Sequence, residues 1–85
     1  MNLKGAKNMF NDIIELCYQL NDQILNGAID SFYQDVKNAG DEFEVLELTS
    51  ELMFYVDEVN ISDEEVEEIK SEIEGLYNKM QDEIE

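Results

Sequence analysis

Apolar residues recur at spacings of three and four along the last third of the chain, which is the period of one face of an α-helix. The members of this series are Val66, Ile69, Ile73, Leu76, Met80 and Ile84. Just before the series, Ser62 and Glu65 have the spacing of a capping box. Ile61 and Val66 have the spacing of a hydrophobic staple, which fixes how the chain enters a helix. The pattern therefore predicts a helix over residues 62–84.

The same period predicts a second helix over about residues 41–59. Its core stripe is Val45, Leu48, Leu52, Tyr55, Val56 and Val59, with Leu46, Thr49 and Met53 beside it. Asp41 can cap the first turn of this helix, and Glu44 follows at the capping-box position. Gly40 can adopt the left-handed conformation that often follows a helix. Residues 38–41 are therefore expected to separate two helices.

Residues 8–39 contain the longest apolar series, and its phase continues across Asn26 and Gly27. The series comprises Phe10, Ile13, Ile14, Cys17, Leu20, Ile24, Leu25, Ala28, Phe32, Val36 and Ala39. Gly27 can end one helix, since glycine is favoured just past a helix C-terminus. Alternatively, one long helix bends there, and the unbroken phase favours this long or kinked helix. Asn8 can cap its start, and residues 1–7 are expected to be frayed.

The apolar arc of this first region is wide. Tyr18, Ile29 and Tyr33 lie outside the main stripe, on the side expected to face solvent. A helix that is apolar over so much of its circumference is usually central in a bundle or part of a subunit contact. Homodimerisation through the first helix is therefore a secondary expectation.

These elements predict an all-α protein, a small bundle of three or four helices. Residues 1–85 are enough for one domain. Within it, the weakly charged first region should pack against an acidic helical hairpin formed by residues 41–59 and 62–84.

Charge changes this picture, because it is distributed unevenly between the two halves of the chain. The net charge is −17, from 22 acidic residues and 5 lysines. Residues 1–40 carry 5 acids and 3 lysines, whereas residues 41–85 carry 17 acids and 2 lysines. Phosphate repulsion excludes direct binding of nucleic acid through so acidic a surface. It does not exclude binding to a protein that itself binds nucleic acid.

The acidic residues do not match a dedicated metal site. An EF-hand loop needs oxygen ligands at positions 1, 3 and 5, a glycine at position 6 and a glutamate at position 12. Counting from Asp57 places Val59 and Ile61 at ligand positions and Ser62 at the glycine position. Counting from Asp35 also places basic or apolar residues at ligand positions. We therefore expect no metal and no cofactor.

The residues present do not indicate a catalytic site either. The chain contains no histidine, the commonest general base. Cys17 lies on the apolar stripe without a cationic neighbour in sequence, which predicts a core residue rather than a nucleophile. We therefore expect a protein that is not an enzyme. A lone cysteine, no long apolar run and no signal-peptide core predict a cytoplasmic protein that does not enter a membrane.

The predicted binding surface consists of carboxylates that the helices do not need for packing. They are Glu44, Glu47, Glu51 and Glu58 on one stripe of the second helix, and Glu64, Glu67 and Glu68 at the start of the last. The alternative is a solvated face that keeps the protein soluble. Against that alternative, residues 41–69 contain no lysine. Like charges one helical turn apart cost about 0.2–0.5 kcal/mol per pair, so the sequence accepts a stability cost.

Phe54, and less clearly Phe43, lies near the side of the second helix that carries Glu47, Glu51 and Glu58. An aromatic side chain bordered by charge can serve as a binding anchor. Alternatively, Phe54 packs beneath the first helix, which is the more common position of a large apolar residue.

In size, acidity and lack of motifs, the chain resembles the small inhibitors made by phages and mobile elements. That class includes nucleic-acid mimics that block restriction enzymes, CRISPR effectors, polymerases or DNA-packaging proteins. The resemblance implies an anti-CRISPR or other anti-defence inhibitor that acts in the host cytoplasm on a basic nucleic-acid-binding protein. The alternatives are an immunity protein that neutralises a basic nuclease toxin, and a helical structural adaptor that uses its weakly charged first helix.

Overall fold

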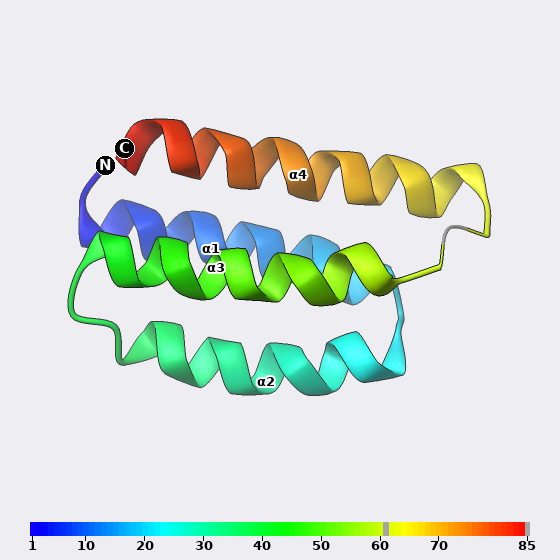
Figure 1. Ribbon diagram of the computed structural model, residues 1–85, viewed down its shortest axis with the longest axis horizontal. Coiled ribbons are helices and arrows are strands. Elements are labelled where there is room, and N and C mark those ends of the chain that lie inside the picture. Colours follow the sequence, from blue (N-terminus) through cyan, green and yellow to red (C-terminus); the bar gives the residue numbers. More distant parts are fainter. Residues whose placement is uncertain (61, 85) are drawn as a thin grey trace.

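The computed structural model describes residues 1–60 and 62–84, and over these residues the chain forms four α-helices and no strands. They are α1 (Leu3–Gln19), α2 (Gln23–Lys37), α3 (Glu42–Glu58) and α4 (Glu64–Ile84). Successive helices run in opposite directions, so both chain ends lie at the same end of the bundle (Figure 1). The expected all-α helical bundle is confirmed. None of the described helices is long and apolar enough to cross a membrane.

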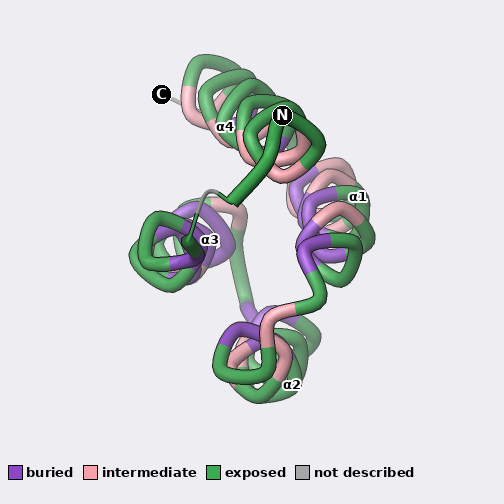
Figure 2. The backbone as a smooth tube through the Cα atoms, turned by 90° about the vertical axis from the view of Figure 1, so that its right-hand side faces the viewer, coloured by how far each residue is buried: buried purple, intermediate pink, exposed green. Residues whose placement is uncertain are grey.

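The helices form an elongated bundle of 36 × 24 × 17 Å in which α1 and α3 occupy the centre. Viewed end-on, α2 and α4 lie on opposite sides of the α1–α3 pair (Figure 2). Both outer helices pack against α1 and α3. The buried side of α1 thus contacts all three other helices. Tyr18 and Tyr33, which were expected to face solvent, are 47% and 44% exposed. Dimerisation through the first helix stays a prediction.

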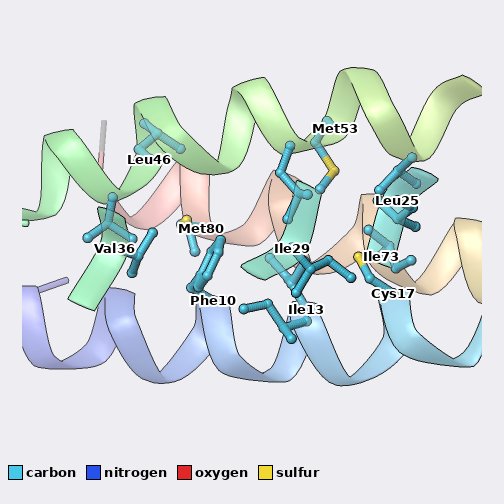
Figure 3. Packing of buried hydrophobic residues seen from close by; sticks show 14 of the residues in the cluster. Phe10, Ile13, Cys17, Leu25, Ile29, Val36, Leu46, Met53, Ile73 and Met80 are labelled. Carbon is cyan, nitrogen blue, oxygen red and sulfur yellow. The ribbon is translucent and has the colours of Figure 1, made fainter. Parts of the chain in front are cut away.

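The core lies between the helices and draws side chains from all four (Figure 3). Its largest fully buried members include Phe10, Ile13, Leu25, Ile29, Leu52, Ile73 and Met80. Thr49 is the only buried polar residue among the described residues, and its hydroxyl donates to the Val45 carbonyl at 2.7 Å. The expected exposure of Ile29 is wrong. The residue is fully buried, because α2 is a separate helix with its own buried face.

The expected long or kinked helix over residues 8–39 is also wrong, because the chain turns between α1 and α2. Leu20 ends α1, and Asn21 follows with a φ of 52°. Asparagine tolerates this left-handed conformation better than most residues. The Asp22 carboxylate then accepts a hydrogen bond from the Leu25 N–H at 2.9 Å and caps α2. The alternative break at residues 26–27 is misplaced too, since Gly27 lies inside α2.

The first residues are helical rather than frayed. The Asn2 side chain accepts from the Gly5 N–H at 2.8 Å and caps α1, which leaves Asn8 inside the helix. The terminal ammonium of Met1 donates to the Glu83 carbonyl at 3.0 Å, so the two ends of the chain are joined.

The starts of α3 and α4 test the other two predicted caps. Asp41 accepts from the Glu44 N–H at 2.8 Å, as expected. Gly40 is not left-handed, since no glycine of the described chain has a positive φ. At α4, Asp63 accepts from the Val66 N–H at 2.9 Å, so the expected Ser62 cap is wrong by one residue. The expected staple involves Ile61, which lies outside the described residues.

Candidate functional site

The outer side of α3 carries the first group of predicted site residues. Glu44, Glu47, Glu51, Phe54 and Glu58 are all exposed. The hundred-degree turn per residue of an α-helix turns Glu47, Glu51, Phe54 and Glu58 away from the buried side chains of Val45, Leu52 and Val56. Glu44 lies at the edge of that buried face. We call Glu44, Glu47, Glu51 and Glu58 the α3 stripe.

The first turns of α4 carry the second group. Glu64, Glu67 and Glu68 are exposed and face away from the buried Ile73. With Ser71 and Glu72 they line a shallow, open depression of about 620 Å³. We call these five residues the α4 cluster. Glu64 and Glu67 also lie in the first helical turn, where the positive end of the helix dipole stabilises a negative charge.

The two acidic groups share one end of the bundle. Glu58 is the last residue of α3 and Glu64 the first of α4, so both lie at the end of the bundle opposite the N-terminus (Figure 1). Glu44 begins α3 at the opposite end of the bundle. The structure therefore brings Glu58 towards the α4 cluster and separates both from Glu44. A partner that contacts all seven predicted carboxylates has to extend along α3 and around onto α4.

One member of the α3 stripe has a structural task of its own. The Glu44 carboxylate accepts from the Gly40 N–H at 2.9 Å, so it ties the α2–α3 turn to the start of α3. Its backbone N–H is already bound by Asp41. Glu44 is therefore the predicted site residue with the clearest role in the fold.

Two lysines bind helix ends. The Lys70 ammonium donates to the carbonyls of Val59 at 3.0 Å and Asp57 at 3.4 Å, at the C-terminus of α3. The Lys7 ammonium donates to the Lys37 carbonyl at 2.9 Å, at the C-terminus of α2. The negative end of a helix dipole favours a cation in this position. These lysines stabilise the C-terminal ends of α2 and α3.

Phe54 does not pack beneath the first helix, so that alternative is wrong. Its side chain is 69% exposed, because α3 turns it away from α1. With Glu51 and Glu58 it lines an open groove of about 540 Å³ between α2 and α3. Phe32 from α2 and Tyr55 from α3 complete the lining. We call this five-residue site the aromatic groove.

Phe32 and Tyr55 were both assigned to the core from the sequence, and the structure places them at the edge of this groove. Tyr55 is 39% exposed, and Phe32 is half-buried. Their rings pack edge to face, with centroids 5.9 Å apart and an angle of 67° between the ring planes. Aromatic pairs favour this geometry, which fixes the orientation of the Tyr55 ring. The groove forms because α2 lies beside α3. The apolar period of the sequence does not predict which helices are neighbours, so it could not predict this site.

Phe43, the less clear of the two aromatic residues predicted to lie near the carboxylates, is also exposed. It is 58% exposed near the start of α3. With Leu46, Ser50 and Tyr77 it lines a second groove, between α3 and α4, and Glu47 and Glu51 flank this groove too. Large apolar side chains thus lie among the carboxylates at both ends of α3.

Two described residues have a pKa raised above its ordinary value. Cys17 is fully buried, and burial raises the pKa of its thiol from 9.0 to about 12, so the nucleophilic thiolate is scarce. The pKa of Tyr18 is also raised, by desolvation and by the charge of Asp30, to which its hydroxyl donates at 3.4 Å. Over residues 1–60 and 62–84, no three His, Cys, Asp or Glu side chains come together as a metal site would require.

Comparison with known proteins finds no family model, no curated protein and no solved structure that matches this chain. The candidate site therefore rests on its own geometry and charge.

Proposed function

We propose that the protein is a non-catalytic inhibitor that binds the basic nucleic-acid-binding surface of another protein. One observation carries the proposal. The α3 stripe, Phe54 and the α4 cluster are exposed on the outer sides of two adjacent helices, whereas the packing of those helices depends on other residues. A stretch of acidic side chains interrupted by an exposed aromatic ring suits a basic partner better than it suits bulk solvent.

The spacing of the carboxylates supports a nucleic-acid-like surface. Side chains three or four positions apart on a helix lie about 5–6 Å from each other. This separation is comparable to that of successive phosphates along one DNA strand. An extended acidic edge formed by α3 and α4 therefore offers a basic cleft a pattern of charge similar to that of its usual ligand.

Electrostatic steering gives this surface a kinetic advantage. A net charge of −17 on 85 residues produces a strong negative field, which speeds encounter with a basic surface. Salt screens this field within about 10 Å at 0.1 M ionic strength. Association should therefore be fast at low salt and much slower at high salt.

The proposed target is a host defence enzyme that binds nucleic acid, such as a CRISPR effector, and the proposed source of the chain is a phage or mobile element. This part of the proposal follows from the size and acidity that the chain shares with such inhibitors.

The test compares variants that lose equal charge from different faces. The site variant replaces Glu64, Glu67 and Glu68 with Gln. The control variant carries Asp12→Asn, Glu15→Gln and Asp35→Asn, three exposed positions on α1 and α2. Each protein is immobilised and used to capture nucleic-acid-binding proteins from bacterial lysate at 50 and 500 mM NaCl.

We expect the wild-type protein and the control variant to retain the same partner at low salt. Added duplex DNA and high salt should both release it. The site variant should bind the purified partner at least about tenfold more weakly, which corresponds to about 1.4 kcal/mol. Equal affinity of wild type and site variant at moderate salt would overturn the proposal, as would a partner that DNA fails to displace.

A further inference from the structure

The aromatic groove has a regular arrangement along α3. Phe54 and Tyr55 lie side by side, Glu51 precedes them by one helical turn and Glu58 follows them by one turn. The two carboxylates are seven positions apart, which corresponds to about 10 Å along the helix axis. The rings therefore lie between two negative charges, with Phe32 closing the α2 side.

We propose that the aromatic groove binds the side chain of an arginine from the partner, with its guanidinium against the rings and between the Glu51 and Glu58 carboxylates. This inference rests on the proposed function and assigns one contact within it. It gives the surface a specific recognition element in addition to its general negative charge.

Arginine suits this groove better than lysine for three physical reasons. The guanidinium is planar and stacks on an aromatic face, which the rounder ammonium does less well. It is more weakly hydrated, so an apolar wall costs it less desolvation. Its several N–H donors point in fixed, divergent directions, so one group can reach carboxylates on two sides.

The groove is also prepared for such a ligand. The contact between Phe32 and Tyr55 holds one ring in place before any partner arrives. The five lining residues, all within the described chain, include no lysine that would occupy the groove from inside. Phe54 remains 69% exposed and is the ring most available for stacking.

The α4 cluster provides an internal comparison on the same molecule. It contains four carboxylates and a serine around a depression of similar size, but no aromatic side chain. The α4 cluster has no ring on which a guanidinium can stack, so arginine should exceed lysine there only through its hydrogen bonds to carboxylates. The preference for arginine is thus expected to be larger at the aromatic groove than at the α4 cluster.

The experiment titrates the ¹⁵N-labelled full chain with Nα-acetyl-arginine N-methylamide and, separately, with the lysine analogue at the same ionic strength. We expect saturable amide shifts at Glu51, Phe54, Tyr55 and Glu58 with the arginine probe, and at least threefold weaker binding of the lysine probe there. At Glu64, Glu67 and Glu68 the difference between the two probes should be smaller than at the aromatic groove. Equal response to both probes at the aromatic groove would overturn the inference.

Two variants separate ring from charge. Phe54→Ala should remove the arginine preference, and because the Phe54 side chain is exposed the change should leave the fold intact. The double variant Glu51→Gln with Glu58→Gln should bind the arginine probe at the groove at least threefold more weakly than the wild type does. A matched change on α4, Glu67→Gln with Glu68→Gln, should leave the groove unaffected. Retention of the arginine preference by Phe54→Ala would refute the assigned role of the rings.

Failure of this inference is distinguishable from failure of the proposed function. If the acidic surface binds a basic partner without an arginine in the groove, Phe54→Ala will keep full partner affinity while the α4 site variant loses it. If both proposals hold, each variant will weaken the partner complex.

Discussion

Cys17 shows at the scale of a single residue how burial suppresses a reactive group. The thiol is fully buried in the core, and its pKa is raised to about 12 from an ordinary value of 9.0. The unfolded chain ionises this thiol above pH 9, whereas the folded chain keeps it protonated. The contribution of Cys17 to folding stability is therefore complete below pH 9 and is lost as the pH rises towards 12.

We expect this titration to appear as a difference in pH dependence between the wild type and Cys17→Ala. Between pH 8 and pH 10 the wild type should lose about 1.4 kcal/mol more of its free energy of unfolding than the variant loses. Urea unfolding at the two pH values measures this difference. The cavity left by the substitution contributes equally at both, as do the tyrosines and lysines. Parallel pH profiles would show that the thiol is not protected in the folded protein.

The site residues differ in how far the sequence revealed them. The exposure of the seven carboxylates follows from their positions opposite the apolar stripe. The exposure of Phe54 follows from the same geometry, yet the general burial of large apolar residues pointed the other way. Tyr55 occupies the edge of the apolar stripe, where a small rotation of α3 decides between core and groove. That rotation depends on how α2 packs against α3, and the local sequence of α3 does not predict it.

At the scale of elements, the apolar period identified the helical regions of the chain but did not separate α1 from α2. The turn at Leu20, Asn21 and Asp22 leaves the phase of the apolar series intact, so α1 and α2 read as one helix. The signal for this turn was chemical: Asn21 tolerates a positive φ, and Asp22 caps the next helix. Gly27 gave the stronger conventional signal for a break, although it occupies an ordinary helical position.

Replacing Gly27 with Ala tests this assignment directly. A Cβ added at Gly27 meets no heavy atom within 4 Å, so alanine should stabilise α2 by about 1 kcal/mol through its higher helix propensity. Gly75→Ala in α4 is open in the same way and should give a similar gain. Gly5→Ala is the contrasting control, since its Cβ would lie 3.2 Å from the Asn2 cap oxygen. Chemical denaturation measures all three, and a loss of stability in Gly27→Ala would favour a break at that residue.

The start of α4 provides a second test at this scale. Asp63→Ala should cost about 1 kcal/mol, because the Asp63 carboxylate caps the Val66 N–H. Ser62→Ala should change the free energy of unfolding by less than about 0.5 kcal/mol, since Ser62 lies outside the cap. Ser62 and Asp63 are both good capping residues, and the capping-box spacing favoured Ser62 although Asp63 is the cap. Equal losses in the two variants would show that both side chains share the cap.

At the scale of the whole molecule, folding and binding place opposite demands on the same charges. The carboxylates of α3 and α4 repel one another in the free protein, and each like-charge pair one turn apart costs about 0.2–0.5 kcal/mol. A basic partner would neutralise that repulsion and convert it into attraction. Added salt therefore has opposite expected effects on the two processes, which makes ionic strength the most informative variable for this protein.

We expect the melting temperature of the free protein to rise by several degrees between 20 and 300 mM NaCl, because screening relieves repulsion within a chain of net charge −17. Circular dichroism at 222 nm measures this rise. The variant with Glu64, Glu67 and Glu68 replaced by Gln should melt at a similar temperature at high salt and show a smaller rise.

Over the same range of salt concentration, the affinity of the protein for a basic partner should fall. Loss of the complex at high salt could not then be caused by unfolding, because the free protein becomes more stable at high salt. It would show that electrostatic attraction between the partners had been screened. A melting temperature that decreases with salt would instead show that the carboxylates make net favourable contacts within the fold.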